Sequence, residues 1–210
     1  MLGAIMKAIH GPVYRRRIEV LRDLIAARLR PGDRVLDVGC GSGALGRALL
    51  DDSRTPAGVG VRGLERFPRD GARIEVDALD GPRFPYEDKS FDVVLVLDVL
   101  HHDRDPASVL RECARVARRA VIVKDHKPDG PAAQARISLL DWAANRPYGV
   151  ECLYTYPSLP GWHALFAESG LRVRAEITTM RLYPFGWNWF FAGRLHYFAE
   201  LEPIGGTAGE

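Results

Sequence analysis

Short apolar runs alternate with amphipathic stretches along most of this chain. Residues 12–29 carry apolar side chains at every third or fourth position, which predicts an amphipathic helix. Further helical patterns begin at Ala44, follow Pro106, and cover 131–145 and 162–169. The apolar runs predict strands that begin at Val35 and cover 57–61, 73–76, 91–97, 120–124, 171–178 and 195–201.

This alternation of strands and helices predicts an α/β fold with a doubly wound, mostly parallel, seven-stranded sheet. The run 93–97 lies between Asp92 and Asp98 and is apolar throughout, as expected for a parallel strand covered on both faces. The last two strands are expected to form an antiparallel pair at one edge. In such sheets ligands bind at the carboxyl ends of the strands, so residues that follow strands are the first candidates for a site.

Composition narrows the possible partners. The 210 residues are 47% hydrophobic and carry a formal net charge of +2, which is too small to indicate a nucleic-acid partner. The three cysteines have no C-x-x-C spacing, so neither a zinc site nor a disulfide scaffold is expected, and we expect a cytoplasmic location and no metal. No run approaches the ~20 apolar residues that cross a bilayer.

A glycine-rich turn joins the first predicted strand to the next helix. Asp37 stands near the end of the strand, and Gly39, Gly41 and Gly43 follow it before the helical pattern begins at Ala44. Glycine allows the main chain to turn sharply and to approach a ligand closely. A strand, a bare turn and a helix N-terminus form a cradle for a small ligand, and the carboxylate suits a cationic group on that ligand.

The stretch 34–46 resembles motif I of the class I S-adenosylmethionine-dependent methyltransferases, in which an acid precedes G-x-G-x-G. The resemblance implies a Rossmann-like fold and S-adenosylmethionine as cofactor, with S-adenosylhomocysteine as product. It places Asp37 and the Gly39 backbone at the amino-acid end of the cofactor. Cys40, Gly41 and Gly43 complete the turn around it.

The resemblance continues through residue 126. In the family the second strand ends in an acid for the ribose hydroxyls; here that position is Arg62, a donor only, with Glu65 three residues further on. The segment 79–92 resembles the family's D-[AG]-x-x-L-P-F-x-D-x-S-F-D motif, which assigns Asp80 and the Gly81 amide to the adenine. The backbone of Leu97, at the end of the fourth strand, would flank the cofactor.

Four residues after the fourth and fifth strands are candidates for catalysis, because imidazole and carboxylate groups accept protons near neutral pH. They are His101, His102, Asp125 and His126, with His126 ranked first. The aromatic segment 182–191 would either wall an apolar acceptor pocket, contact a membrane surface, or pack in the core.

We expect one domain over residues 1–210. Its parts are a helical segment (1–32), a cofactor-binding core (33–126), substrate-side helices and final strands (127–201) and a tail (202–210). The resemblance to ubiquinone- and menaquinone-type enzymes implies methyl transfer to a small, partly apolar or lipid-like acceptor. The oligomeric state stays open.

Two other functions fit parts of the sequence. Gly41, Gly43 and Gly46 also spell G-x-G-x-x-G, and Arg62 would suit the phosphate of NADP in an oxidoreductase. Asp37 has no evident role there, and no lysine lies four residues after a tyrosine, as a short-chain dehydrogenase requires. The second alternative is a binding module that holds S-adenosylmethionine without turnover, which the absent strand-two acid makes conceivable.

Overall fold

The computed structural model describes residues 2–68, 70–145, 152–182 and 194–205. Its helices are α1 (Leu2–Ala26), α2 (Ala44–Asp51), the short 3₁₀ helix η1 (Leu100–His102), α3 (Pro106–Val116), α4 (Ala133–Asn145) and α5 (Leu159–Glu168). Its strands are β1 (Arg34–Val38), β2 (Gly60–Glu65), β3 (Val76–Ala78), β4 (Phe91–Leu97), β5 (Ala117–His126), β6 (Leu171–Ile177) and β7 (His196–Pro203).

The strands form one seven-stranded sheet in the order β3-β2-β1-β4-β5-β7-β6. The first five strands are parallel, and β7 runs antiparallel to both of its neighbours, β5 and β6. This confirms the predicted α/β fold, including the antiparallel pair at one edge. The order reverses direction between β1 and β4, which places the crevice for a ligand at the carboxyl ends of those two strands.

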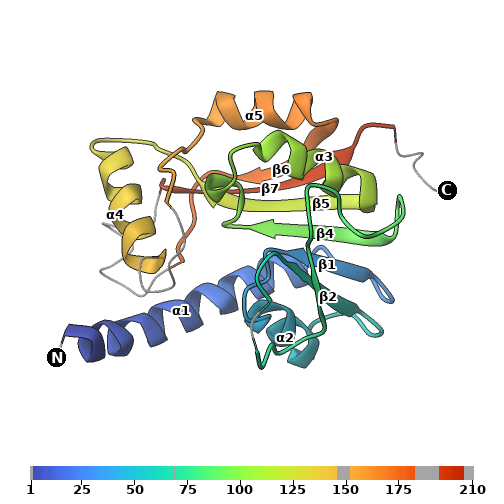
Figure 1. The fold of residues 1–210 in the computed structure, drawn as a ribbon, viewed down its shortest axis with the longest axis horizontal. Helices are drawn as coiled ribbons and strands as arrows, with labels where there is room; N and C mark the ends of the chain where they lie inside the picture. Colours follow the sequence, from blue (N-terminus) through green and yellow to red (C-terminus); the bar gives the residue numbers. More distant parts are fainter. Residues whose placement is uncertain (1, 69, 146–151, 183–193, 206–210) are drawn as a thin grey trace.

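Helices cover both faces of the sheet, because successive side chains of each buried strand point to opposite faces. Val94 and Val96 of β4 belong to the apolar cluster that includes α3 and α5, whereas Val93 and Leu95 belong to the cluster that includes α1 and α2 (Figure 1). α4 lies apart from both layers, beyond the carboxyl ends of β4 and β5 (Figure 1). It therefore stands over the edge where the site is expected.

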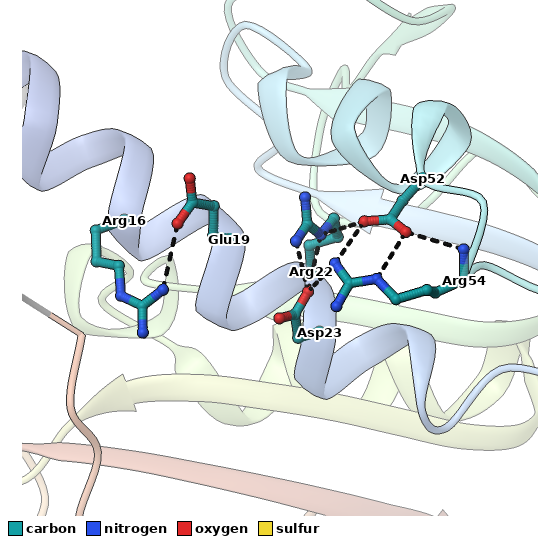
Figure 2. A network of polar contacts seen from close by, with 6 residues as sticks. All are labelled: Arg16, Glu19, Arg22, Asp23, Asp52 and Arg54. Atoms are coloured by element: carbon teal, nitrogen blue, oxygen red, sulfur yellow. Dashed lines mark hydrogen bonds and ion pairs between the residues drawn. The ribbon is translucent and has the colours of Figure 1, made fainter.

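Ion pairs attach α1 to the loop after α2 (Figure 2). The Arg22 Nε lies 2.8 Å from the Asp52 Oδ2, and the Arg54 guanidinium reaches both Asp52 (2.7 Å) and Asp23 (2.8 Å). Hydrogen bonds from Arg54 hold the pKa of the Asp52 carboxyl below its usual range. The network therefore ties α1 to the C-terminal end of α2.

Several boundaries differ from those expected. α1 begins at Leu2 rather than at residue 12, β3 begins at residue 76 rather than 73, and β5 begins at residue 117 rather than 120. β2 covers Gly60–Glu65, so it ends at Glu65 and not before Arg62. Most of the aromatic segment 182–191 lies outside the described residues; Leu182 itself is buried. Among the described residues no helix combines the length and the apolar character needed to span a membrane.

Candidate functional site

The glycine turn follows β1 and leads into α2. Gly39, Gly41 and Gly43 all have positive φ angles of 56–68°, a conformation that costs other residues ~1–2 kcal/mol. A Cβ on Gly39 would come within 2.4 Å of Val99, and one on Gly43 within 2.6 Å of Ile74. A Cβ on Gly41 would meet nothing within 4 Å. Two glycines are therefore needed for close packing, and the third faces open space that a ligand can fill.

Asp37 lies at the end of β1 with only 4% of its surface exposed. Burial raises the pKa of its carboxyl to about 7; the nearby Glu65 adds to this rise and Arg17 opposes it. A buried carboxylate with so little positive charge near it favours the binding of a ligand that carries a cationic group. This is the electrostatic property that a ligand with an ammonium group requires.

Glu65 is the acid at the end of β2, and the expectation that this strand end lacks one is wrong. Its Oε2 accepts a hydrogen bond from the Gly41 amide at 2.9 Å, and its Oε1 accepts one from the Arg66 amide at 2.9 Å. Arg62 lies in mid-strand, where its guanidinium contacts Asp77 (2.6 Å) and Glu75 (3.2 Å). The structure thus brings Glu65, and not Arg62, to the glycine turn.

The remaining residues predicted for the cofactor lie around this turn. Cys40 packs so close to β2 that a Cβ on Gly63 would lie 2.5 Å from its Sγ, and burial raises the pKa of its thiol to about 12. Asp80 and Gly81 form an exposed loop after β3, and Leu97 is the buried last residue of β4. No ligand is present to test these contacts, so they stay predictions.

A second group of charges lies where β4 and β5 end. Asp98 follows β4 and has a positive φ of 55°. Its Oδ1 accepts a hydrogen bond from the Lys124 Nζ at 2.5 Å. Arg17 of α1 also pairs with Asp98. Despite burial, Lys124 and Arg17 hold the pKa of Asp98 well below its usual range. The lysine inside an apolar strand was the sequence signal for this buried pair.

The four predicted catalytic residues come together beside Asp98. The His101 Nδ1 lies 2.6 Å from the Asp125 Oδ1, and the ring centroids of His101 and His126 are 5.1 Å apart. The His101 and His102 rings are 4.0 Å apart. The carboxyl ends of β4 and β5 therefore form one histidine-rich cluster.

The two central histidines carry different charges. Burial works against the charged form of His101, but the Asp125 carboxylate outweighs it and raises the pKa to about 10. Burial and the Lys124 charge lower the pKa of His126 to about 4, although Asp98 lies 3.8 Å from its Nε2. Near neutral pH, His101 is a cation and His126 is neutral.

Sequence reasoning missed three members of this cluster. Asp141 of α4 is buried and accepts a hydrogen bond from the Tyr156 hydroxyl at 2.7 Å. The buried His196 ring of β7 lies 4.9 Å from the His126 ring. A carboxylate in the apolar stretch 137–143 was the available signal for Asp141; nothing in the sequence linked Tyr156 or His196 to the site.

A cavity of about 340 Å³ adjoins the cluster between η1, α3 and α5. Besides His101, its lining consists of six apolar residues and three polar ones: Leu100, Pro106, Leu153, Pro157, Trp162 and Leu165, with Asp103, Arg104 and Thr155. This space can take a small, partly apolar molecule next to the histidines.

The sheet order, the glycine turn, Asp37 near the end of β1 and Glu65 at the end of β2 define a Rossmann-like fold. The family described as "Methyltransferase domain" matches residues 13–176. The chain therefore belongs to this family of methyltransferase domains.

Individual relatives agree with this assignment. The chain is 39% identical over 99 residues to the 27-O-demethylrifamycin SV methyltransferase of Amycolatopsis mediterranei, covering 43% of this chain and 36% of that protein. It is 39% identical over 99 residues to the ubiquinone biosynthesis O-methyltransferase of Hahella chejuensis, covering 42% and 40%. The chain thus spans about two fifths of the length of these curated relatives.

Solved structures share the fold. A SAM-dependent methyltransferase from Aquifex aeolicus has a TM-score of 0.61 at 16% identity, covering 96% of this chain and 98% of that one. The Burkholderia thailandensis 1,6-didemethyltoxoflavin-N1-methyltransferase, with its substrate and S-adenosylhomocysteine bound, has a TM-score of 0.62 at 16% identity, covering 90% and 78%. At these identities the likeness concerns the fold alone.

Proposed function

We propose that the chain transfers the methyl group of S-adenosylmethionine to a small, partly apolar acceptor. The observation that carries the proposal is the pair of acids around the open Gly41: Asp37, buried with little compensation, and Glu65, hydrogen-bonded to the turn. An ammonium group and a ribose diol are the ligand groups that these two carboxylates complement.

Each part of the cofactor has residues that suit it. Asp37 and the Gly39 backbone would hold the amino-acid end, and Glu65 takes over the ribose contact that the sequence assigned to Arg62. The adenine remains assigned to Asp80 and the Gly81 amide. The backbones of Cys40, Gly41, Gly43 and Leu97 would line the site between them.

The bound cofactor supplies an already activated methyl group, so the chain mainly has to align the reactants and exclude water. The neutral His126 would accept a proton from the acceptor, and Asp98, 3.8 Å away, would stabilise the resulting imidazolium. Asp125 positions His101 and keeps it charged, and His102 adjoins it. The roles of these four residues are part of the proposal.

The acceptor class rests on the cavity and on the relatives. The cavity beside His101 has mostly apolar walls, and the names of the two relatives refer to rifamycin and ubiquinone synthesis. A small-molecule or lipid-like acceptor, a cytoplasmic location and a peripheral contact with a membrane are compatible with this picture.

The Glu65→Gln variant tests the assignment. The amide oxygen of glutamine still accepts from the Gly41 amide, so the turn is kept while the charge that faces the ribose is lost. We expect S-adenosylhomocysteine to bind about tenfold more weakly by calorimetry, which corresponds to about 1.4 kcal/mol for a charge-assisted hydrogen bond.

The control is Glu75→Gln, which removes an exposed carboxylate that pairs with Arg62 at 3.2 Å. The affinity of this variant for S-adenosylhomocysteine should equal that of the wild type. Equal affinities in all three proteins would contradict the role of Glu65. Tight binding without methylation of any acceptor in a cell extract would identify a binding module without turnover.

A further inference from the structure

Three side chains of the histidine cluster converge on one point between η1 and α4. The His101 Nε2 lies 3.5 Å from the Asp141 Oδ1, and the His102 Nε2 lies 3.6 Å from the same oxygen. All three donor atoms lie within 4.8 Å of one another. We propose that this His–His–Asp triad (His101, His102 and Asp141) binds a divalent transition-metal ion.

The separations fit coordination better than hydrogen bonding. Hydrogen bonds from nitrogen to oxygen span about 2.7–3.2 Å, which is shorter than both distances. Donor atoms around a tetrahedral ion with bonds of about 2.1 Å are ~3.4 Å apart. Both nitrogen–oxygen distances are therefore close to the spacing that a shared ion would impose.

The contacts behind the triad are those that orient metal ligands. Asp125 holds the His101 Nδ1 at 2.6 Å, which turns the Nε2 on the other side of the ring toward Asp141. Tyr156 donates to the Asp141 Oδ2 at 2.7 Å and leaves Oδ1 facing the two imidazoles. An ion bound at His101 takes the place of the proton that Nε2 otherwise carries.

The charge of the pocket suits a dication. The Asp141 and Asp125 side chains are both 0% exposed. The Asp125 Oδ2 is a buried oxygen that has no hydrogen-bond partner within the described part of the chain. A divalent ion that replaces the Nε2 proton of His101 would balance the charges of both buried carboxylates.

A second set of donors in the same cluster is less suitable. Asp98, His101 and His126 are also close enough to share an ion. Asp98, however, already pairs with Lys124 and Arg17, and these two cations would repel a metal. The structure therefore favours Asp141 as the carboxylate ligand.

Two imidazoles and one carboxylate suit Zn²⁺, Fe²⁺ or Co²⁺ and leave coordination positions open. His101 also lines the 340 Å³ cavity, so an acceptor oxygen there would lie beside the ion. An oxygen bound to such an ion loses its proton more easily. This use of the ion rests on the proposed function, whereas metal binding itself does not.

Titration of the chelator-treated chain with Co²⁺ and Zn²⁺ tests the site. We expect one ion per chain and visible Co²⁺ absorption that Zn²⁺ abolishes. His102→Gln replaces the most exposed ligand, at 19%, and should weaken Zn²⁺ binding by at least about 100-fold. Tyr156→Phe keeps all three ligands and should weaken it by about tenfold, because it removes the bond that orients Asp141.

The control is His163→Gln, which removes an exposed histidine paired with Glu176 at 2.9 Å and should bind Zn²⁺ like the wild type. The proposal would be overturned if the wild type bound no Zn²⁺. It would also be overturned if Zn²⁺ affinity fell in His163→Gln but stayed unchanged in His102→Gln. If His102→Gln does not fold, the Tyr156→Phe variant provides the test. An unchanged Zn²⁺ affinity of that variant contradicts the site. Calorimetry with S-adenosylhomocysteine on the same samples reports separately on the proposed function.

Discussion

At the scale of single residues, the most unusual feature is the carboxylate of Asp37, which is buried beside a second acid. Its pKa of about 7 lies above the value of 3.8 for an exposed aspartate, so the folded chain binds a proton that the unfolded chain has lost between these two pH values. The free energy of unfolding of the ligand-free protein should therefore fall as pH rises from about 4 to 7. A shift of this size corresponds to a change on the order of 4 kcal/mol.

The same property predicts how cofactor binding depends on pH. Only the ionised Asp37 attracts an ammonium group, and the α-amino group of a ligand stays charged below about pH 7.7. Affinity for S-adenosylhomocysteine should rise by nearly tenfold between about pH 5.5 and 6.5, measured by calorimetry. In Asp37→Asn this rise should disappear and the affinity should be low throughout. A variant that keeps the pH dependence of the wild type would show that another group causes it.

Single residues also show where sequence reasoning stopped. The acid–glycine pattern placed Asp37 and the turn correctly, because backbone geometry imposes glycine there. Glu65 was not recognised as a strand end, since β2 has the mixed sequence 60–65 and its hydrogen bonds, not an apolar run, extend it. Asp141 approaches His101 from 40 positions away, a contact that no local spacing encodes.

At the scale of elements, the attachment of α1 matters because this helix carries Arg17 to Asp98 at the site. Asp52 ties α1 to the loop after α2 through Arg22 and Arg54 (Figure 2). Strand number, order of elements and buried faces followed from periodicity. The extension of α1 to Leu2 did not, because Gly11 and Pro12 interrupt the helical pattern in the sequence.

Replacing Asp52 tests this attachment. Asp52→Ala should lower the melting temperature more than Asp51→Ala, because Asp51 is 64% exposed and, in the described part of the chain, pairs with Arg47 of the same helix alone. The difference should shrink in concentrated salt, which screens exposed charges. Equal melting temperatures of the two variants at low salt would show that the network does not hold α1.

At the scale of the whole molecule, the sheet order places the carboxyl ends of β1, β2 and β4 around the glycine turn. The carboxyl ends of β4 and β5 carry the histidine cluster next to it. The glycine turn and the histidine cluster therefore lie on either side of the end of β4, at Leu97 and Asp98. This arrangement follows from a mostly parallel sheet, whose carboxyl ends share an edge. It could be predicted from the strand pattern, whereas the position of α4 over that edge could not.

A crystal structure of the chain with S-adenosylhomocysteine tests the central claim most directly. We predict one ligand per chain, with its amino group at Asp37, its ribose hydroxyls on Glu65 and its adenine beside Asp80. A glycine turn that stays empty at saturating ligand, or that binds NADPH instead, would contradict the account.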